Sequence, residues 1–206
     1  MQSLAITWLG HSAFRLRTPG GKEVLIDPWY TGNPSFPESA RPKTADLILL
    51  SHGHSDHTGD AASIAKDTGA TVVGIFEITA WLGSKGIKNI EPMNKGGTIK
   101  VKGLSITMTD ARHSSSVDDS GTVYLGEAAG FIVRLENGQT IYFAGDTSLF
   151  GDMKLIGELQ TRHRVPADRR SLHDGPGHRG DGGEMARRET GRADALRHVP
   201  VADRHA

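Results

Sequence analysis

Short apolar segments separated by polar turns fill the first part of the chain. Segments 4–10 and 13–18 alternate apolar and polar side chains with a period of two, which is typical of half-buried strands. A polar turn leads from them into a further strand at 23–27. The runs at 45–51 and 71–76 are continuously apolar and predict strands that are buried on both faces.

Helical segments lie between these strands. We expect three helices, at 60–70, 77–86 and 152–160. The first has the clearest boundaries, because Thr58 or Asp60 can cap its N-terminus and Gly69 can end it. A strand at 103–113 and a hairpin at 130–146 follow, the latter with Asn137-Gly138 as its turn. This mixture predicts a layered α/β protein with sheets inside and helices outside.

Composition excludes several classes of protein. The 206 residues suffice for one domain or two fused half-domains, and the formal net charge of zero argues against general nucleic-acid or membrane-surface binding. Without cysteine, a transition metal would have to be held by His and carboxylate. Neither a signal peptide nor a membrane span is evident, so we expect a soluble, cytoplasmic protein.

A cluster of metal-ligand residues follows the buried strand at 45–51. His52, His54, Asp56 and His57 form the pattern H-x-H-x-D-H. Alternation at a strand end directs His52 and His54 to the same side, so both imidazoles can share one metal. The chain then turns and can present a carboxylate and an imidazole to a second metal. A single histidine is usually structural, but four ligand-type residues in six positions predict a metal site.

Four more residues could complete this site. His113 and Asp146 follow predicted strands and enter loops of small residues. Asp27 also ends a strand and could orient a ligand from behind, whereas His11 could line the pocket. A strand-end His or Asp usually caps a turn, so each residue also has an ordinary structural interpretation.

Five motifs together resemble the metallo-β-lactamase superfamily. They are WLGHSAF, LIDPW, SHGHSDH, ARHSSS and AGDT, in the order seen in that superfamily. They are most similar to its small metal-dependent hydrolase branch, related to L-ascorbate-6-phosphate lactonases and N-acyl-phosphatidylethanolamine phospholipases. The resemblance covers residues 1–160 and implies an αβ/βα four-layer sandwich. It also implies a ligand set: His52, His54 and His113 for one metal, Asp56 and His57 for the second, and Asp146 as a bridge.

The implied chemistry is hydrolysis of a small-molecule ester, lactone, amide or phosphodiester. Two divalent cations about 3.5–4 Å apart would lower the pKa of a shared water and polarise the substrate oxygen. Zn²⁺ suits an all-His/Asp site, with Mn²⁺ or Fe²⁺ as alternatives. Asp56 is the carboxylate expected to assist proton transfer as well as to bind metal.

The last segment, 161–206, has a different composition. It holds ten of the fifteen arginines and five of the ten histidines, with no lysine, Phe, Trp, Tyr or Ile. It could be a disordered tail or a basic binding arm. The resemblance, however, requires two C-terminal motifs that are missing. A reading frame shifted by one base permits Pro-Ile-Gly-Gly-Leu-Tyr-Thr-Met-Gly-Pro over 167–176 and Met-His-Phe-Gly-Thr-Phe-Pro over 194–200.

We therefore hypothesise that the chain is one hydrolase domain at 1–160, with an incomplete C-terminal half, followed by a frameshifted tail. In the printed frame the C-terminal histidine ligand is lost. This leaves two alternatives to an active hydrolase. One is a non-catalytic remnant or impaired enzyme, and the other is an RNA-processing nuclease of the same superfamily. The charge of residues 1–160, with 14 basic and 17 acidic side chains, does not favour the nuclease.

Overall fold

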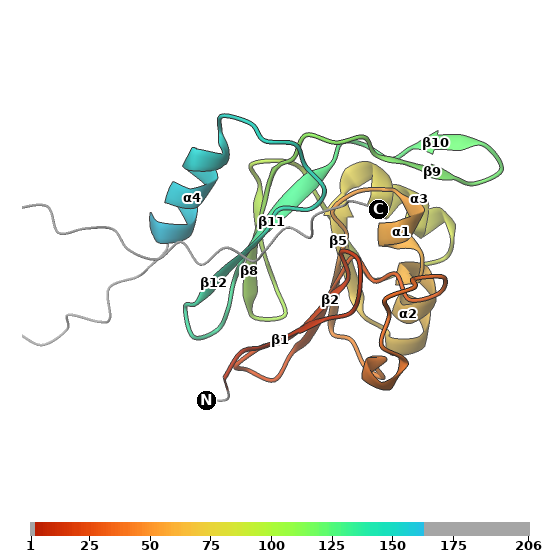
Figure 1. Ribbon diagram of the computed structural model, residues 1–206, viewed down its shortest axis with the longest axis horizontal. Coiled ribbons are helices and arrows are strands. Elements are labelled where there is room, and N and C mark those ends of the chain that lie inside the picture. Colours follow the sequence, from red (N-terminus) through yellow and green to blue (C-terminus); the bar gives the residue numbers. More distant parts are fainter. Residues whose placement is uncertain (1–2, 163–206) are drawn as a thin grey trace, which may run out of the picture. The chain divides into compact units, whose positions relative to one another are not determined.

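The computed structural model describes residues 3–162 (Figure 1). The hypothesis of a shifted frame concerns 161–206, which lies outside the described residues except for its first two positions.

A mixed sheet of six strands forms the first half of the fold. In spatial order its strands are β1 (Ala5–Trp8), β2 (Phe14–Arg17), β3 (Glu23–Ile26), β4 (Leu47–Leu49), β5 (Thr71–Ile75) and β6 (Ile90–Met93). The first three strands pair antiparallel, and β3 to β6 pair parallel. Every residue of β3, β4 and β5 is buried, and for β4 and β5 the apolar runs predict this burial. The sequence did not reveal β6, an edge strand that contains Pro92.

An antiparallel sheet of four strands forms the second half. In spatial order its strands are β12 (Thr140–Phe143), β11 (Ala129–Arg134), β8 (Leu104–Asp110) and β7 (Thr98–Val101). The predicted hairpin is confirmed as β11 and β12, with Gly138 at a φ of +82° in its turn. A separate two-stranded ribbon consists of β9 (Ser116–Asp118) and β10 (Thr122–Tyr124).

All three predicted helices are present. The described helices are α1 (Ser55–Thr58), α2 (Ala61–Thr68), α3 (Phe76–Ser84), α4 (Met153–Arg162) and the short 3₁₀ helix η1 (Glu38–Ala40). Gly69 ends α2 in the left-handed conformation, as predicted. Asp60 stands at the N-cap of α2, but its carboxylate instead accepts hydrogen bonds from the amides of Tyr30 and Thr31. Asp60 therefore fixes the loop after β3. None of the described helices is long and apolar enough to cross a membrane.

The two sheets share one apolar core. Leu25 and Ile48 of the mixed sheet and Ile106 and Phe131 of the antiparallel sheet belong to it, and none of the four is accessible to solvent. The carboxyl ends of parallel strands β3 and β4 lie at the same edge of their sheet, so the loops that follow them are neighbours. These two loops carry much of the candidate site.

Candidate metal centre

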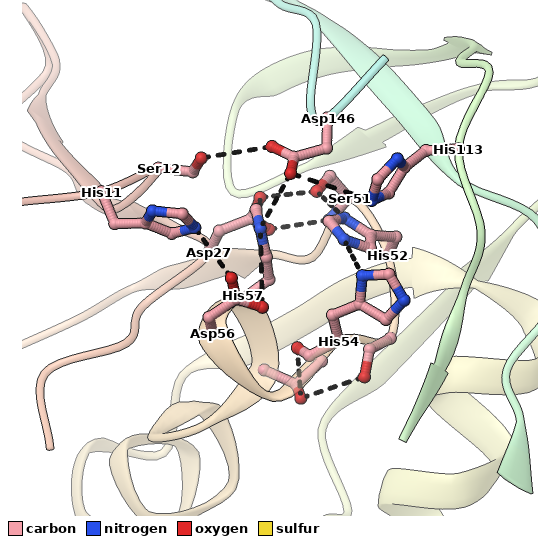
Figure 2. Close-up of polar contacts among 12 residues, drawn as sticks. His11, Ser12, Asp27, Ser51, His52, His54, Asp56, His57, His113 and Asp146 are labelled. Atoms are coloured by element: carbon pink, nitrogen blue, oxygen red, sulfur yellow. Dashed lines mark hydrogen bonds and ion pairs between the residues drawn. The ribbon is translucent and has the colours of Figure 1, made fainter. Parts of the chain in front are cut away.

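All eight residues proposed from the sequence meet at one place (Figure 2). They come from six parts of the chain: the β1–β2 loop (His11), the end of β3 (Asp27), the segment after β4 (His52 and His54), α1 (Asp56 and His57), the loop after β8 (His113) and the loop after β12 (Asp146). His54 is the last extended residue before α1, so the chain turns directly after the first histidine pair. The turn gives Asp56 and His57 a different direction from that pair.

The first cluster consists of three histidines. His52, His54 and His113 each offer a ring nitrogen, and these atoms lie within 4.8 Å of one another. Nε2 of His52 is 3.0 Å from Nδ1 of His54. Two nitrogens on a tetrahedral zinc ion are separated by about 3.3 Å, given zinc–nitrogen bonds of about 2.0–2.1 Å. The spacing of this pair therefore fits a shared metal ion.

Burial keeps His52 and His54 of this cluster uncharged at neutral pH. It lowers the pKa of His52 to about 3, with a further contribution from the neighbouring His57. The pKa of His54 is also lowered, first by burial and then by His113. Neutral imidazole is the form that donates a lone pair to a metal, so at neutral pH these two residues need not lose a proton to bind one.

His57 is the centre of the second cluster, and its side chain is fully buried. Nδ1 lies 2.8 Å from Oδ2 of Asp27. Nε2 makes no hydrogen bond to any described residue, although carboxylate oxygens of Asp146 and Asp56 lie at 3.6 and 4.0 Å. Burial alone would lower the pKa of His57, but Asp146 and Asp27 outweigh it and raise the pKa to about 10. These carboxylates favour positive charge here, whether it is a proton or a metal ion.

Asp27 holds His57 in place. Its carboxylate accepts hydrogen bonds from the Ser51 amide at 2.8 Å and the Ser51 hydroxyl at 2.5 Å, besides its contact with His57. Asp27, His52 and His57 are also close enough to form a ligand group of their own. Because both oxygens of Asp27 are already engaged, the geometry favours an orienting role. Sequence reasoning missed Ser51, since a serine at a strand end carries no distinctive signal.

Asp146 lies between the two clusters (Figure 2). Its Oδ2 is 3.6 Å from Nε2 of His57 and 3.9 Å from Nε2 of His113, and its Oδ1 accepts a hydrogen bond from Ser12 at 3.3 Å. The contact with His57 lowers the pKa of Asp146, which is therefore ionised at neutral pH. Its neighbour Gly145 has a φ of +65°.

His11 and Asp56 complete the arrangement. Nε2 of His11 is 2.9 Å from Oδ2 of Asp56. His11, Asp56 and His57 each offer one donor atom, and these three atoms lie within 4.8 Å of one another. The structure thus brings His11, which the sequence assigned to the pocket, next to the second group of candidate ligands.

An α/β fold of two facing sheets, with a His/Asp cluster at the edge of its parallel strands, defines the metallo-β-lactamase class. Residues 22–167 match the family model of a beta-lactamase superfamily domain. The chain belongs to the UPF0173 metal-dependent hydrolase family of this superfamily.

Two members show the extent of the similarity. One, from Rubrobacter xylanophilus, is 52% identical over 157 residues, which cover 75% of this chain and 65% of the relative. Another, from Koribacter versatilis, is 50% identical over 161 residues, which cover 77% of this chain and 69% of the relative. The chain thus matches about two thirds of the length of these relatives.

A solved structure is also similar. Igni18, described as a metallo hydrolase from the archaeon Ignicoccus hospitalis, superimposes with a TM-score of 0.65 at 37% sequence identity. The match covers 76% of this chain and 66% of Igni18.

Proposed function

We propose that this chain is a metal-dependent hydrolase with two adjacent metal positions. The observation that carries the proposal is the environment of His57. This buried imidazole is held at Nδ1 by Asp27, and its Nε2 faces two carboxylates without making a hydrogen bond to a described residue. A buried polar atom without a partner is costly, and a histidine fixed by a carboxylate at one nitrogen is a common arrangement for a metal ligand at the other.

The proposed ligand set follows from the two clusters. His52, His54 and His113 hold the first metal, Asp56 and His57 hold the second, and Asp146 reaches both. The donors are nitrogen and oxygen only, which suits Zn²⁺ and also permits Mn²⁺ or Fe²⁺. When bound, the cations supply an acidified water and polarise the scissile carbonyl or phosphoryl group.

The protein's own residues have distinct tasks in this proposal. Asp27 fixes the tautomer and orientation of His57 through the hydrogen bond at Nδ1. Asp56 has the most exposed side chain of the three aspartates, at 38%, against 26% for Asp146 and 0% for Asp27. Asp56 is therefore the group best placed to exchange a proton with a reacting molecule.

The proposed substrate is a small molecule with an ester, lactone, amide or phosphodiester bond. The motif resemblance to L-ascorbate-6-phosphate lactonases makes a lactone the first class to test. An RNA substrate is a weaker candidate, because the formal net charge of the chain is zero.

The test combines metal analysis with hydrolysis assays. Zinc-loaded protein is assayed with a simple γ-lactone, p-nitrophenyl acetate, an anilide and bis(p-nitrophenyl) phosphate, and a labelled RNA is added over a salt series. We expect zinc-dependent turnover of at least one small substrate. This turnover should fall by at least about 100-fold in His113→Asn, which removes a proposed ligand, and remain unchanged in Lys102→Asn, a change in the β7–β8 turn.

Other outcomes would support the alternatives. Cleavage of RNA alone, suppressed by salt, would favour the nuclease. Failure to retain any metal, together with no turnover, would identify a non-catalytic remnant.

A further inference from the structure

The tight loop between β1 and β2 holds His11 in a restricted conformation. His11 has a φ of +50° and Gly10 a φ of +92°. A Cβ atom at Gly10 would lie 2.8 Å from the backbone of Ser35, so the loop passes very close to a second segment. A non-glycine residue in the left-handed region costs free energy and persists where the surrounding structure requires it.

The imidazole of His11 faces the second cluster from this loop (Figure 2). Its ring lies edge-on to Trp29 and His57, with centroid distances of 5.4 and 5.3 Å. Nε2 is buried and 2.9 Å from Oδ2 of Asp56, yet the two atoms are not aligned as a hydrogen bond. Two ligand atoms of one metal ion lie close together in the same way, with both lone pairs directed at the ion rather than at each other.

We propose that His11 is a further protein ligand of the second metal position, beside Asp56, His57 and the shared Asp146. One donor atom from each of His11, Asp56 and His57 lies within 4.8 Å of the other two, which is close enough for one divalent cation. This inference rests on the proposed function, but it adds a ligand that the motif resemblance does not include. Together with Asp146, it gives the second position four donors from described residues, independent of any C-terminal histidine.

The inference is tested by metal binding, without reference to turnover. His11→Asn removes the imidazole and keeps a residue that tolerates positive φ, and His11→Gly removes the side chain and its backbone strain. Lys102→Asn is the matched control, because Lys102 has a φ of +51° and lies away from the site in the β7–β8 turn. Each protein is loaded with Zn²⁺, desalted and analysed for zinc per chain. Both affinities are then measured against a chromophoric chelator, and thermal unfolding is recorded in EDTA.

We expect two zinc ions per chain in the wild type and in Lys102→Asn. Both His11 variants should retain one zinc ion per chain after desalting. The affinity for the second ion should fall by more than about 100-fold, because removing a ligand itself weakens binding more than removing a residue that only hydrogen-bonds to a ligand. The affinity for the first ion should be unchanged. Unfolding in EDTA should show that at least the glycine variant is folded.

Three results would overturn the inference. Two ions bound with unchanged affinity in a folded His11 variant would leave His11 as a pocket residue. A wild type that binds one ion and hydrolyses substrate would refute the second metal position, and the role of His11 with it, while preserving the proposed hydrolase activity. A wild type that binds none would refute both proposals.

Discussion

At the residue scale, the orientation of His57 depends on one buried carboxylate. Asp27→Asn keeps the shape and fits the φ of +46°, but the amide cannot replace all three hydrogen bonds accepted from Ser51 and His57. We expect metal affinity to fall about 10–100-fold and the free energy of unfolding to fall by about 1–3 kcal/mol. Chelator competition and urea denaturation measure these effects. Asp46→Asn, which alters the carboxylate that accepts from the Glu23 amide, should leave metal affinity unchanged. Equal losses in both variants would contradict a specific role for Asp27.

The buried histidines also predict how stability depends on pH after chelation. The pKa of His52 is about 3 in the folded protein and about 6.5 when unfolded, so the unfolded chain binds more protons between these values. The free energy of unfolding should therefore fall as the pH drops below 6.5, by up to about 1.4 kcal/mol per pH unit from His52, and His54 acts in the same direction.

The shifted pKa values of His57 and Asp146 affect stability outside this pH window. His57 has a raised pKa, so its stabilisation is complete below pH 6.5 and is lost only as the pH rises towards 10. Asp146 has a lowered pKa, so its contribution declines only below its ordinary value of 3.8. Urea denaturation in EDTA from pH 6.5 to 4.5 measures the slope. We expect a smaller slope in His52→Asn, and an unchanged one would refute the assignment to His52.

Candidate site residues differed in how far the sequence could predict them. The H-x-H-x-D-H pattern places four of them within six positions, so local geometry alone brings them together. His11 and Asp146 are 135 positions apart, and only the fold brings both to His57. The hydrogen bond from the Ser51 hydroxyl to Asp27 could not be predicted from the hydrophobic pattern, because it depends on how the ends of two strands meet in the fold.

At the element scale, the loop after β12 has room for Asp146 only because Gly145 precedes it. An added Cβ at Gly145 would lie 2.7 Å from the carbonyl oxygen of Ala129 and 3.0 Å from the Ser51 side chain. Gly138 has a similar positive φ but open space around it. Gly138→Ala should therefore lower the free energy of unfolding by about 1–2 kcal/mol, through backbone strain alone.

Gly145→Ala should lower the free energy of unfolding by about 1–3 kcal/mol more than Gly138→Ala does, because the added methyl group overpacks the loop. It should also weaken metal binding by displacing Asp146. Thermal unfolding and zinc titration of both variants check this, and equal behaviour would show that crowding at Gly145 has no role in placing Asp146.

Prediction of the elements succeeded where burial or a turn left a clear pattern. The apolar runs of β4 and β5 and the Asn-Gly hairpin between β11 and β12 were all recognised. Strands β6 and β7 were missed because they lie at sheet edges, where most side chains are exposed or half-buried and hydrophobicity carries little information. Their positions depend on pairing with neighbours rather than on local propensity.

At the scale of the whole molecule, the antiparallel sheet has an apolar groove beside α4. The groove has a volume of about 460 Å³, and Met108, Ile132 and Phe150 are among its lining residues. Leu155 and Leu159 of α4 also line it, although 56% and 40% of their surfaces remain exposed. The matched relatives are longer than the region they share with this chain. If the shifted frame is the true one, the restored chain after about residue 160 is expected to cover this groove.

This hypothesis predicts a difference between two chains. The coding DNA is first resequenced across 157–161 and on to the stop codon, and the printed chain and the frame-restored chain are then expressed in parallel. Covering the parts of Leu155 and Leu159 that are still exposed would contribute about 0.6–1.7 kcal/mol for each side chain. The restored chain should therefore unfold at a higher denaturant concentration and bind less of an apolar dye. Its C-terminal histidine should also bind the second zinc ion, so His11→Asn should weaken that ion less than in the printed chain. Equal stability and equal sensitivity to His11→Asn would show that the printed frame gives the native protein and that the groove has another role.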